Sequence, residues 1–282
     1  MSPLVGVAEL AARIHDPLLR VCDVRWYLAD PALGRREYGE GHLPGAVFVD
    51  LEEVLTGDEG PGRHPLPRPG EFARAIGALG IGPHHRVVAY DASGGSTAAR
   101  LWWMLRAIGH PEVAVLDGGL PAWVEAGHAV STEVPGHPPE DVPAPERWPG
   151  VVDRHLVAAS LGRIVLLDAR AGERYRGEIE PVDPVAGHIP TARNVPYATL
   201  LDGHRLLPVG ELRNRLALAG VSPERPTVAS CGSGVTACHL LLAMEVAGMG
   251  SGLLYEGSWS DWSAHLALPV ATGTDPGAVT DA

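Results

Sequence analysis

The stretch that decides the fold is 227–248, which reads TVASCGSGVTACHLLLAMEVAG. Residues 227–230 form a short apolar, β-branched run, which is typical of a buried strand. Residues 231–236 form a loop with two glycines, and a helical pattern then runs from Ala237 until it stops at Gly248. The pattern therefore places Cys231 where a strand passes through a tight loop into a helix.

This position has chemical consequences for Cys231. Loop N–H groups and the helix dipole converge on its sulfur and favour the thiolate. The glycines let the backbone curl around the sulfur where a Cβ would obstruct it. We therefore predict that Cys231 is a nucleophile in an anion-holding loop. The alternative, a packed core cysteine, stays open for Cys231 and is the preferred interpretation of Cys22 and Cys238.

Composition limits the remaining possibilities. A chain of 282 residues is long enough for two domains, and its net charge of −12 argues against nucleic acid or an anionic membrane as a main partner. Lysine is absent, so an anion site must use arginine, backbone N–H groups or helix ends. Three unevenly spaced cysteines make no disulfide framework, and no secretion signal or membrane span stands out. We expect a cytoplasmic protein with free thiols.

Four sequence blocks recur in the same order in the two halves of the chain. The first half reads RVCDVRW, EGHLPGAVFVD, RVVAYDASGGSTAARLWWMLRAIG and VAVLDGGLPAWVEAG; the second reads IVLLDARA, AGHIPTARNVP, PTVASCGSGVTACHLLLAMEVAG and GLLYEGSWSDW. The period far exceeds the roughly 20–50 residues of solenoid repeats, so it predicts a duplicated domain. We predict domains at 1–130 and 151–270, joined by a proline-rich, extended linker at 131–150 and followed by a tail at 271–282.

Each half alternates strand-like and helix-like segments. In the first half the pattern predicts strands at 20–24, 47–50, 86–90 and 113–116, and helices at 71–79, 96–108 and 120–126. The strands are apolar throughout, as expected for parallel strands covered on both faces. The predicted fold class is α/β, with two domains that each hold a parallel sheet flanked by helices. Such sheets bind ligands beyond the carboxyl ends of their strands, which is where Cys231 falls.

The duplication is asymmetric at the loop that carries Cys231. Aligning ASCGSGVTA with AYDASGGSTA places Asp91 opposite the cysteine. A carboxylate has no thiol chemistry, so only the second half can carry a reaction centred on sulfur. Capping of the helix that follows it is a sufficient explanation for Asp91.

These features resemble the two-domain rhodanese-type sulfurtransferases: the tandem arrangement, the HLPGA block at 42–46, the CGSGVTA loop, and YEGSWSDW at 255–262. The loop is similar to the 3-mercaptopyruvate branch, because the thiosulfate branch has basic residues where Gly232 and Ser233 stand here. The resemblance implies that Cys231 takes sulfur from 3-mercaptopyruvate as a persulfide and passes it to a thiol or cyanide, without a cofactor. A thioredoxin-like reductant is a further candidate partner.

The resemblance also implies roles for particular residues. The persulfide charge would be held by the loop, namely Gly232, Ser233, Gly234, Val235 and Thr236. Arg174 would bind the donor's carboxylate, and Ser233 with His42 would assist pyruvate release. His42 has a simpler alternative as a turn-stabilising hydrogen-bonder, because both halves carry a histidine there. Arg170 has one too, because both halves keep an arginine two residues after a strand aspartate.

Three positions depart from the family pattern, and one of them is Asp261, which stands where the closing motif usually has glutamate. Val182 stands where the mercaptopyruvate branch carries a second arginine, which leaves the donor in doubt. Thr191 stands where the GHIPG block has glycine.

Other classes of protein share parts of this pattern. A cysteine-dependent phosphatase or arsenate reductase needs an arginine six residues after the cysteine, and this chain has Ala237 there. A thiosulfate sulfurtransferase and a non-catalytic persulfide carrier both stay open. The 13 histidines include His84 and His85, but they show no helical ligand spacing beside a cysteine cluster, so we predict no metal.

Overall fold

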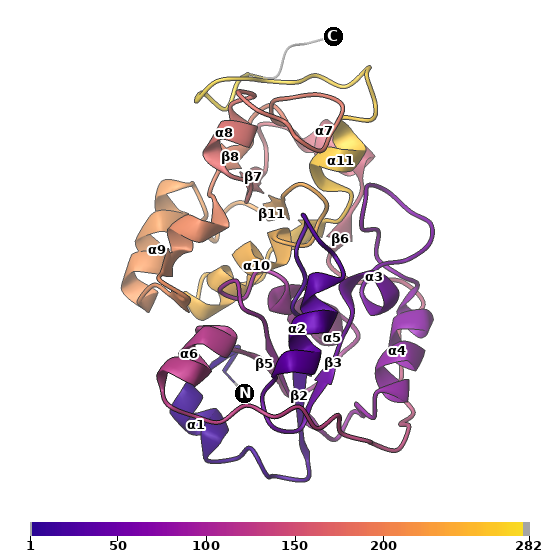
Figure 1. The fold of residues 1–282 in the computed structure, drawn as a ribbon. Coiled ribbons are helices and arrows are strands. Elements are labelled where there is room, and N and C mark those ends of the chain that lie inside the picture. Colours follow the sequence, from indigo (N-terminus) through magenta and orange to yellow (C-terminus); the bar gives the residue numbers. More distant parts are fainter. Residues whose placement is uncertain (1, 279–282) are drawn as a thin grey trace. The chain divides into compact units, whose positions relative to one another are not determined.

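The computed structural model describes residues 2–278 (Figure 1). It divides into two compact units. Unit 1 comprises the chain up to Gly57, Pro67–Pro149 and Leu201–Leu206; unit 2 comprises Asp58–Leu66, Gly150–Leu200 and the chain from Leu207 onward. Two short segments, Asp58–Leu66 and Leu201–Leu206, thus group with the unit built on the other half of the chain.

Unit 1 holds a five-stranded sheet with all strand pairs parallel. In spatial order its strands are β1 (Leu4–Val5), β5 (Val113–Leu116), β4 (Arg86–Tyr90), β2 (Leu19–Asp23) and β3 (Ala46–Phe48). The predicted strands at 86–90 and 113–116 agree with β4 and β5, and the other two agree with β2 and β3 to within two residues. The two-residue β1 was not predicted, because it is too short to show a period.

The helices of unit 1 follow the strands along the chain. They are α1 (Val7–Ala11), α2 (Leu33–Glu40), α3 (Leu51–Val54), α4 (Pro69–Ala78), α5 (Ala98–Ala107) and α6 (Gly119–Glu125). Helix α5 begins two residues later than predicted, because residues 92–97 stay in a loop around Asp91. The core packs Val88 and Tyr90 of β4 against Ala114 and Trp123.

Unit 2 repeats this architecture. Its parallel sheet has the order β6 (Val151–Val152), β12 (Leu253–Tyr255), β11 (Thr227–Ser230), β7 (Val165–Asp168) and β8 (Arg193–Asn194). Its helices are α7 (Arg154–Ser160), α8 (Gly172–Tyr175), α9 (Val209–Leu218), α10 (Ala237–Val246) and α11 (Ser258–Trp262), with a 3₁₀ turn at Tyr197–Leu200. The predicted α/β fold with a duplicated parallel-sheet domain is confirmed.

Two segments are exchanged between the halves. Residues 58–66 of the first half belong to unit 2, and the hairpin of β9 (Leu201–Asp202) and β10 (Arg205–Leu206) belongs to unit 1. The predicted boundaries assigned each segment to its own half. Both segments are short and rich in glycine, proline or charge, so no hydrophobic period shows where they fold.

The proline-rich linker has no helix, and an isolated bridge between Ser131 and His42 is its one β interaction among the described residues. It groups with unit 1, where the Glu140 N–H donates to the Gly77 carbonyl at 2.9 Å. A Cβ on Gly77 would lie 2.2 Å from the Glu140 carbonyl oxygen, so the linker can approach α4 only because this residue is glycine.

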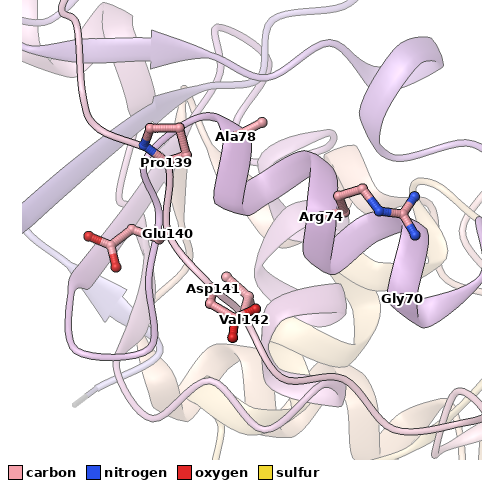
Figure 2. A pocket seen from close by; sticks show the side chains of 7 residues that line it. All are labelled: Gly70, Arg74, Ala78, Pro139, Glu140, Asp141 and Val142. Carbon is pink, nitrogen blue, oxygen red and sulfur yellow. The ribbon is translucent and has the colours of Figure 1, made fainter.

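Figure 2 shows the surface pocket that the linker forms with α4. Its volume is about 350 Å³, and its lining consists of Gly70, Arg74 and Ala78 on α4 and residues 139–142 of the linker. The lining contains three charged side chains but neither cysteine nor histidine. Chemistry centred on a thiol therefore has to be sought elsewhere.

The tail packs on unit 2 as far as it is described. Ala271 pairs with His188 in an antiparallel bridge, and the Gly273 N–H donates to the Arg176 carbonyl at 2.9 Å. Residues 279–282 of the predicted tail lie outside the described residues. No helix within 2–278 has the length and apolar character that a membrane crossing requires.

Candidate active site

Cys231 lies directly after β11, at the carboxyl edge of the unit 2 sheet. Its Sγ accepts a hydrogen bond from the Gly234 N–H at 3.1 Å, and the residue is 3% exposed. Its own N–H donates to Ser258 Oγ at 3.0 Å, while its carbonyl accepts from the Trp259 N–H at 3.0 Å. The first turn of α11 thus fixes the backbone of the cysteine, and the loop directs an N–H group at its sulfur.

Glycine is required at position 234. Its φ is +79°, and a Cβ there would lie 2.2 Å from the Glu256 carbonyl oxygen. Any other residue would force the loop away from Glu256 and turn the Gly234 N–H away from the sulfur. Among the N–H groups of residues 232–236 that sequence reasoning placed around the anion, this is the one that bonds Sγ in the thiol state described here.

Ser233 forms a short hydrogen bond with a histidine that sequence reasoning did not select. Its Oγ lies 2.7 Å from Nδ1 of His64, and both residues are buried. His64 arrives on the exchanged segment 58–66, which is anchored where the Leu66 N–H donates to Glu256 Oε2 at 2.9 Å. The residue type gave no signal, because the stretch GPGRHPLP shows neither a helical nor a strand period.

His42, the predicted partner of Ser233, has other contacts. Its ring stacks on Tyr38 at a centroid distance of 4.0 Å, and its nitrogens lie 2.8 Å from the Tyr38 carbonyl oxygen and 3.0 Å from that of Glu133. The second half repeats the arrangement, with His188 stacked on Tyr175 at 3.7 Å. A catalytic role for His42 stays a prediction, and these contacts are those of a turn-stabilising histidine.

Arg174, the predicted carboxylate-binding residue, lies on α8 beside the cysteine loop. Its Nη1 is 3.5 Å from the point where a Cβ on Gly232 would stand. Its Nη2 bonds Glu180 at 2.6 Å and Asp183 at 3.1 Å. Burial alone would raise the pKa of Glu180, but the hydrogen bond from Arg174 and nearby backbone N–H groups lower it, so the pair is ionic.

A second guanidinium group lies at the same place. Nη2 of Arg63, which is also on the exchanged segment, is 3.2 Å from the same point above Gly232. Arg63 is ion-paired with Asp183, the residue after Val182. The sequence gave no reason to single out Arg63, because its proximity to Gly232 depends on which unit the segment joins.

Arg170 has the contacts of a structural residue, and unit 1 repeats them. Arg170 bonds Asp168 at 2.7 Å, and Arg25 bonds Asp23 at 2.6 Å in the first unit. Each guanidinium also donates to a glycine carbonyl of the following block. These buried pairs fix the loop that follows β7 in unit 2 and the loop that follows β2 in unit 1.

One cluster of metal-ligating residues occurs in unit 1. His84, His85 and Glu140 bring ligand atoms within 4.8 Å of one another. However, Nδ1 of His85 accepts the Gly82 N–H at 2.8 Å, so a neutral His85 carries its proton on Nε2. This protonation opposes ligation through Nε2, and the predicted absence of a metal stays a prediction.

Known proteins resemble this chain along nearly its whole length. Residues 6–126 and 154–265 each match the model of the rhodanese-like domain. The chain belongs to the rhodanese family. A probable 3-mercaptopyruvate sulfurtransferase of Pseudomonas aeruginosa is 45% identical over 281 residues, which cover 96% of this chain and 99% of that protein. The putative thiosulfate sulfurtransferase SseB of Mycobacterium tuberculosis is 41% identical over 285 residues, covering 96% and 97%.

A solved structure gives the same result for this rhodanese. The crystal structure of the 3-mercaptopyruvate sulfotransferase SseA from Escherichia coli superposes with a TM-score of 0.81 at 34% sequence identity, covering 92% of this chain and all of that one. The predicted tandem rhodanese fold is confirmed. The names of the relatives bear out the predicted sulfurtransferase class and the predicted 3-mercaptopyruvate branch.

Proposed function

We propose that this rhodanese transfers sulfur from 3-mercaptopyruvate through a persulfide on Cys231. One observation carries the proposal: the Cys231 sulfur receives the Gly234 N–H beside a Ser233–His64 hydrogen bond and the Arg174 guanidinium. Nucleophile, proton-handling pair and carboxylate-binding group then lie on one loop and its neighbours. Relatives at 45% and 37% identity that are named for 3-mercaptopyruvate support this choice of donor.

In the first step the Cys231 thiolate attacks the sulfur of the donor. An S–S bond forms and the donor's C–S bond breaks, with its electron pair going to carbon as the enolate of pyruvate. The hydrogen of the donor thiol ends on the pyruvate methyl group, so the products are pyruvate and a persulfide anion. Two-step transfer through a covalent intermediate is ordinary nucleophilic catalysis.

The Ser233–His64 pair is suited to relay that proton. Ser233 can donate its hydroxyl proton to the departing enolate and recover one through His64, whose Nδ1 lies 2.7 Å from Oγ. The donor thiol replaces the proton, so none is gained or lost over the step. His64 fills here the role that the sequence assigned to His42.

Arg174 is placed to hold the donor's carboxylate during this step. Its Nη2 and Nε bond the carboxylates of Glu180 and Asp183, while Nη1 is the nitrogen nearest to Gly232. A carboxylate bound at Nη1 would lie beside Gly232, the residue after Cys231. The two protein carboxylates then act as a rigid support for the guanidinium.

In the second step a nucleophilic acceptor attacks the outer sulfur and releases the Cys231 thiolate. A small thiol, cyanide or the thiol of a thioredoxin-like reductant can each do this, and we propose a cytoplasmic setting for the reaction. Persulfide charge resides on the outer sulfur, where loop N–H groups can stabilise it without changing their own protonation.

A second candidate function is thiosulfate sulfurtransfer. The 41% identity to a relative named for thiosulfate favours it. Against it, neither position after the cysteine is basic, since they hold Gly232 and Ser233.

Intact mass spectrometry tests the proposal. Incubation with 3-mercaptopyruvate is expected to add one sulfur to the protein, and a reducing thiol is expected to remove it. Cys231→Ser is expected to abolish the gain, whereas the matched variant Cys238→Ser keeps it. A gain with thiosulfate alone would assign the second candidate function, and a gain that survives in Cys231→Ser would move the chemistry to Cys238. A persulfide without multiple turnover would identify a carrier.

A further inference from the structure

The place where the family pattern has a second arginine is occupied by Val182, and another arginine lies beside it. Val182, Asp183 and Arg63 line one surface depression of about 450 Å³ in unit 2. Arg63 comes from the exchanged segment, far from residue 182 along the chain. A guanidinium is therefore present at this wall of the depression although the local sequence lacks it.

The Arg63 side chain is held in a defined position. Its guanidinium is ion-paired with Asp183, whose side chain is 3% exposed, and its backbone N–H donates to Ser260 Oγ at 3.0 Å. A Cβ on Gly62, the preceding residue, would lie 2.5 Å from the Gly257 carbonyl oxygen, so the segment can lie this close only with glycine there. The position of Arg63 is thus built into the fold of unit 2.

Two guanidinium groups consequently flank the residue that follows the nucleophile. Arg63 Nη2 and Arg174 Nη1 lie 3.2 Å and 3.5 Å from the same point above Gly232. Both arginines also bond the two oxygens of Asp183, which spaces them apart. An anionic group near Gly232 would meet hydrogen-bond donors of both guanidinium groups.

Arg63 also has a donor that the protein does not use. Its Nε is buried and has no hydrogen-bond partner among the described residues. An unsatisfied buried donor costs about 1–3 kcal/mol, and more in a charged group. Nε and Nη2 form one edge of the guanidinium fork, which is the edge that binds a carboxylate through two parallel hydrogen bonds.

We propose that Arg63 is the second carboxylate-binding arginine of this site and takes the place of the arginine missing at Val182. The inference rests on the proposed function and deepens it, because it names a residue that selects donors with a carboxylate. In 3-mercaptopyruvate the carboxylate lies two carbons from the reacting sulfur, whereas thiosulfate has no carboxylate. Loss of Arg63 should therefore weaken the binding of 3-mercaptopyruvate more than the binding of thiosulfate.

Steady-state kinetics of the full chain with both donors tests this assignment. Arg63→Ala is expected to lower kcat/KM for 3-mercaptopyruvate by about 10- to 100-fold, mainly through KM, because a charged hydrogen bond contributes about 1.5–3 kcal/mol. Arg63→Lys is expected to recover only part, since an ammonium cannot make the planar fork. The matched control is Arg176→Ala, a half-buried arginine of unit 2 paired with Glu178, which should leave kcat/KM unchanged for both donors.

The decisive variant places a guanidinium at residue 182, where the family pattern has it. The double variant Arg63→Ala with Val182→Arg is expected to have a kcat/KM for 3-mercaptopyruvate at least tenfold higher than that of Arg63→Ala. If Arg63 were purely structural, Arg63→Ala would lower the unfolding temperature and lower kcat/KM equally for both donors. Val182→Arg would then restore no activity. Either result overturns the assignment. Should Arg63→Ala fail to fold, Arg63→Lys compared with Arg176→Lys carries the same test. If the wild type neither turns over 3-mercaptopyruvate nor forms a persulfide, the proposed function itself fails. If the wild type turns over 3-mercaptopyruvate and the Arg63 variants have the same kcat/KM, only the role assigned to Arg63 is refuted.

Discussion

The two units carry the same loop after the same strand and differ in what fills it. In unit 1 the Asp91 carboxylate accepts the N–H groups of Ser93, Gly95, Thr97 and Ala98 at 2.7–2.9 Å. In unit 2 the Cys231 sulfur accepts the Gly234 N–H at 3.1 Å. The carboxylate of Asp91 thus fills the loop of unit 1 with four backbone N–H donors, whereas the sulfur of Cys231 receives one in unit 2.

The comparison also indicates what unit 2 is built to hold. A carboxylate oxygen of aspartate and the outer sulfur of a cysteine persulfide are the same number of bonds from Cα. Asp91 thus places its charge at the depth that the persulfide of Cys231 would reach, while the thiol sulfur stops one bond short. We therefore expect the N–H groups of the unit 2 loop to donate further hydrogen bonds once a second sulfur is bound to Cys231.

The exchanged segments 58–66 and 201–206, which contact these loops, also differ between the two units. Each is anchored by a backbone N–H that donates to the carboxylate directly after β5 or β12: Leu206 to Asp117 at 3.0 Å, and Leu66 to Glu256 at 2.9 Å. In unit 1 the segment presses Leu201 against Gly94, whereas in unit 2 it brings His64 to Ser233. The exchanged segment thus brings an apolar side chain to the Asp91 loop and a polar side chain to the Cys231 loop.

The largest expected effect separates the two kinds of histidine. His64→Ala should lower turnover of 3-mercaptopyruvate by about 10²–10⁴-fold, the range for loss of a proton-transfer group, with little change in unfolding temperature. His42→Gln should lower the unfolding temperature but change turnover of the folded enzyme by no more than a few-fold, because its ring bonds backbone carbonyls. Thermal denaturation and initial rates on both variants measure this. Equal loss of turnover in both would reinstate His42 in the mechanism.

The next effect contrasts the two loops directly. Asp91→Ala should cost about 3–5 kcal/mol of unfolding free energy, because several buried N–H groups lose their acceptor at once. Cys231→Ala removes the acceptor of one N–H group and should cost about 1–2 kcal/mol. Urea denaturation of the two variants gives both values. Similar losses of unfolding free energy in Asp91→Ala and Cys231→Ala would contradict the proposed difference between the two loops.

A smaller effect comes from a backbone difference between the repeats. Gly45 in unit 1 has φ +73°, and Thr191 stands at the matching place with φ +69°, where a β-branched residue is strained by about 1–3 kcal/mol. Thr191→Gly should stabilise the protein by about 1 kcal/mol after loss of the hydrogen bond from the Gly162 N–H. Gly45→Thr should destabilise it by about 1–3 kcal/mol. Thermal melts check both signs, and a destabilised Thr191→Gly would contradict the strain argument.

Sequence patterns predicted the parts of this molecule that depend on local regularity. Residues 227–230 form β11 as expected, and Cys231 follows it, because an apolar run, a glycine loop and a helix leave one arrangement. Arg63 and His64 could not be predicted, because they reach the site through the exchange of an aperiodic segment. That exchange depends on contacts such as Leu66 with Glu256, which join residues far apart in the chain.

The smallest effect concerns the response of the units to acid. Burial lowers the pKa of His85 to about 4, and burial also lowers the pKa of His110 and His137; all three lie in unit 1. In unit 2 the pKa of His188 is lowered for the same reason. Because the unfolded chain takes up these protons near pH 6.5, the folded state loses stability as pH falls from about 6.5 toward 4.

His85→Asn isolates this effect, because the asparagine oxygen can replace Nδ1 as acceptor of the Gly82 N–H without titrating. The variant should lose less unfolding free energy than the wild type between pH 7.5 and pH 5. The exposed His155→Asn in unit 2 should keep the wild-type dependence. Urea denaturation at the two pH values measures the difference. If the unfolding free energy of His85→Asn depends on pH as that of the wild type does, His85 does not set the sensitivity of unit 1 to acid. The contrast between the units would then be confined to the loops that carry Asp91 and Cys231.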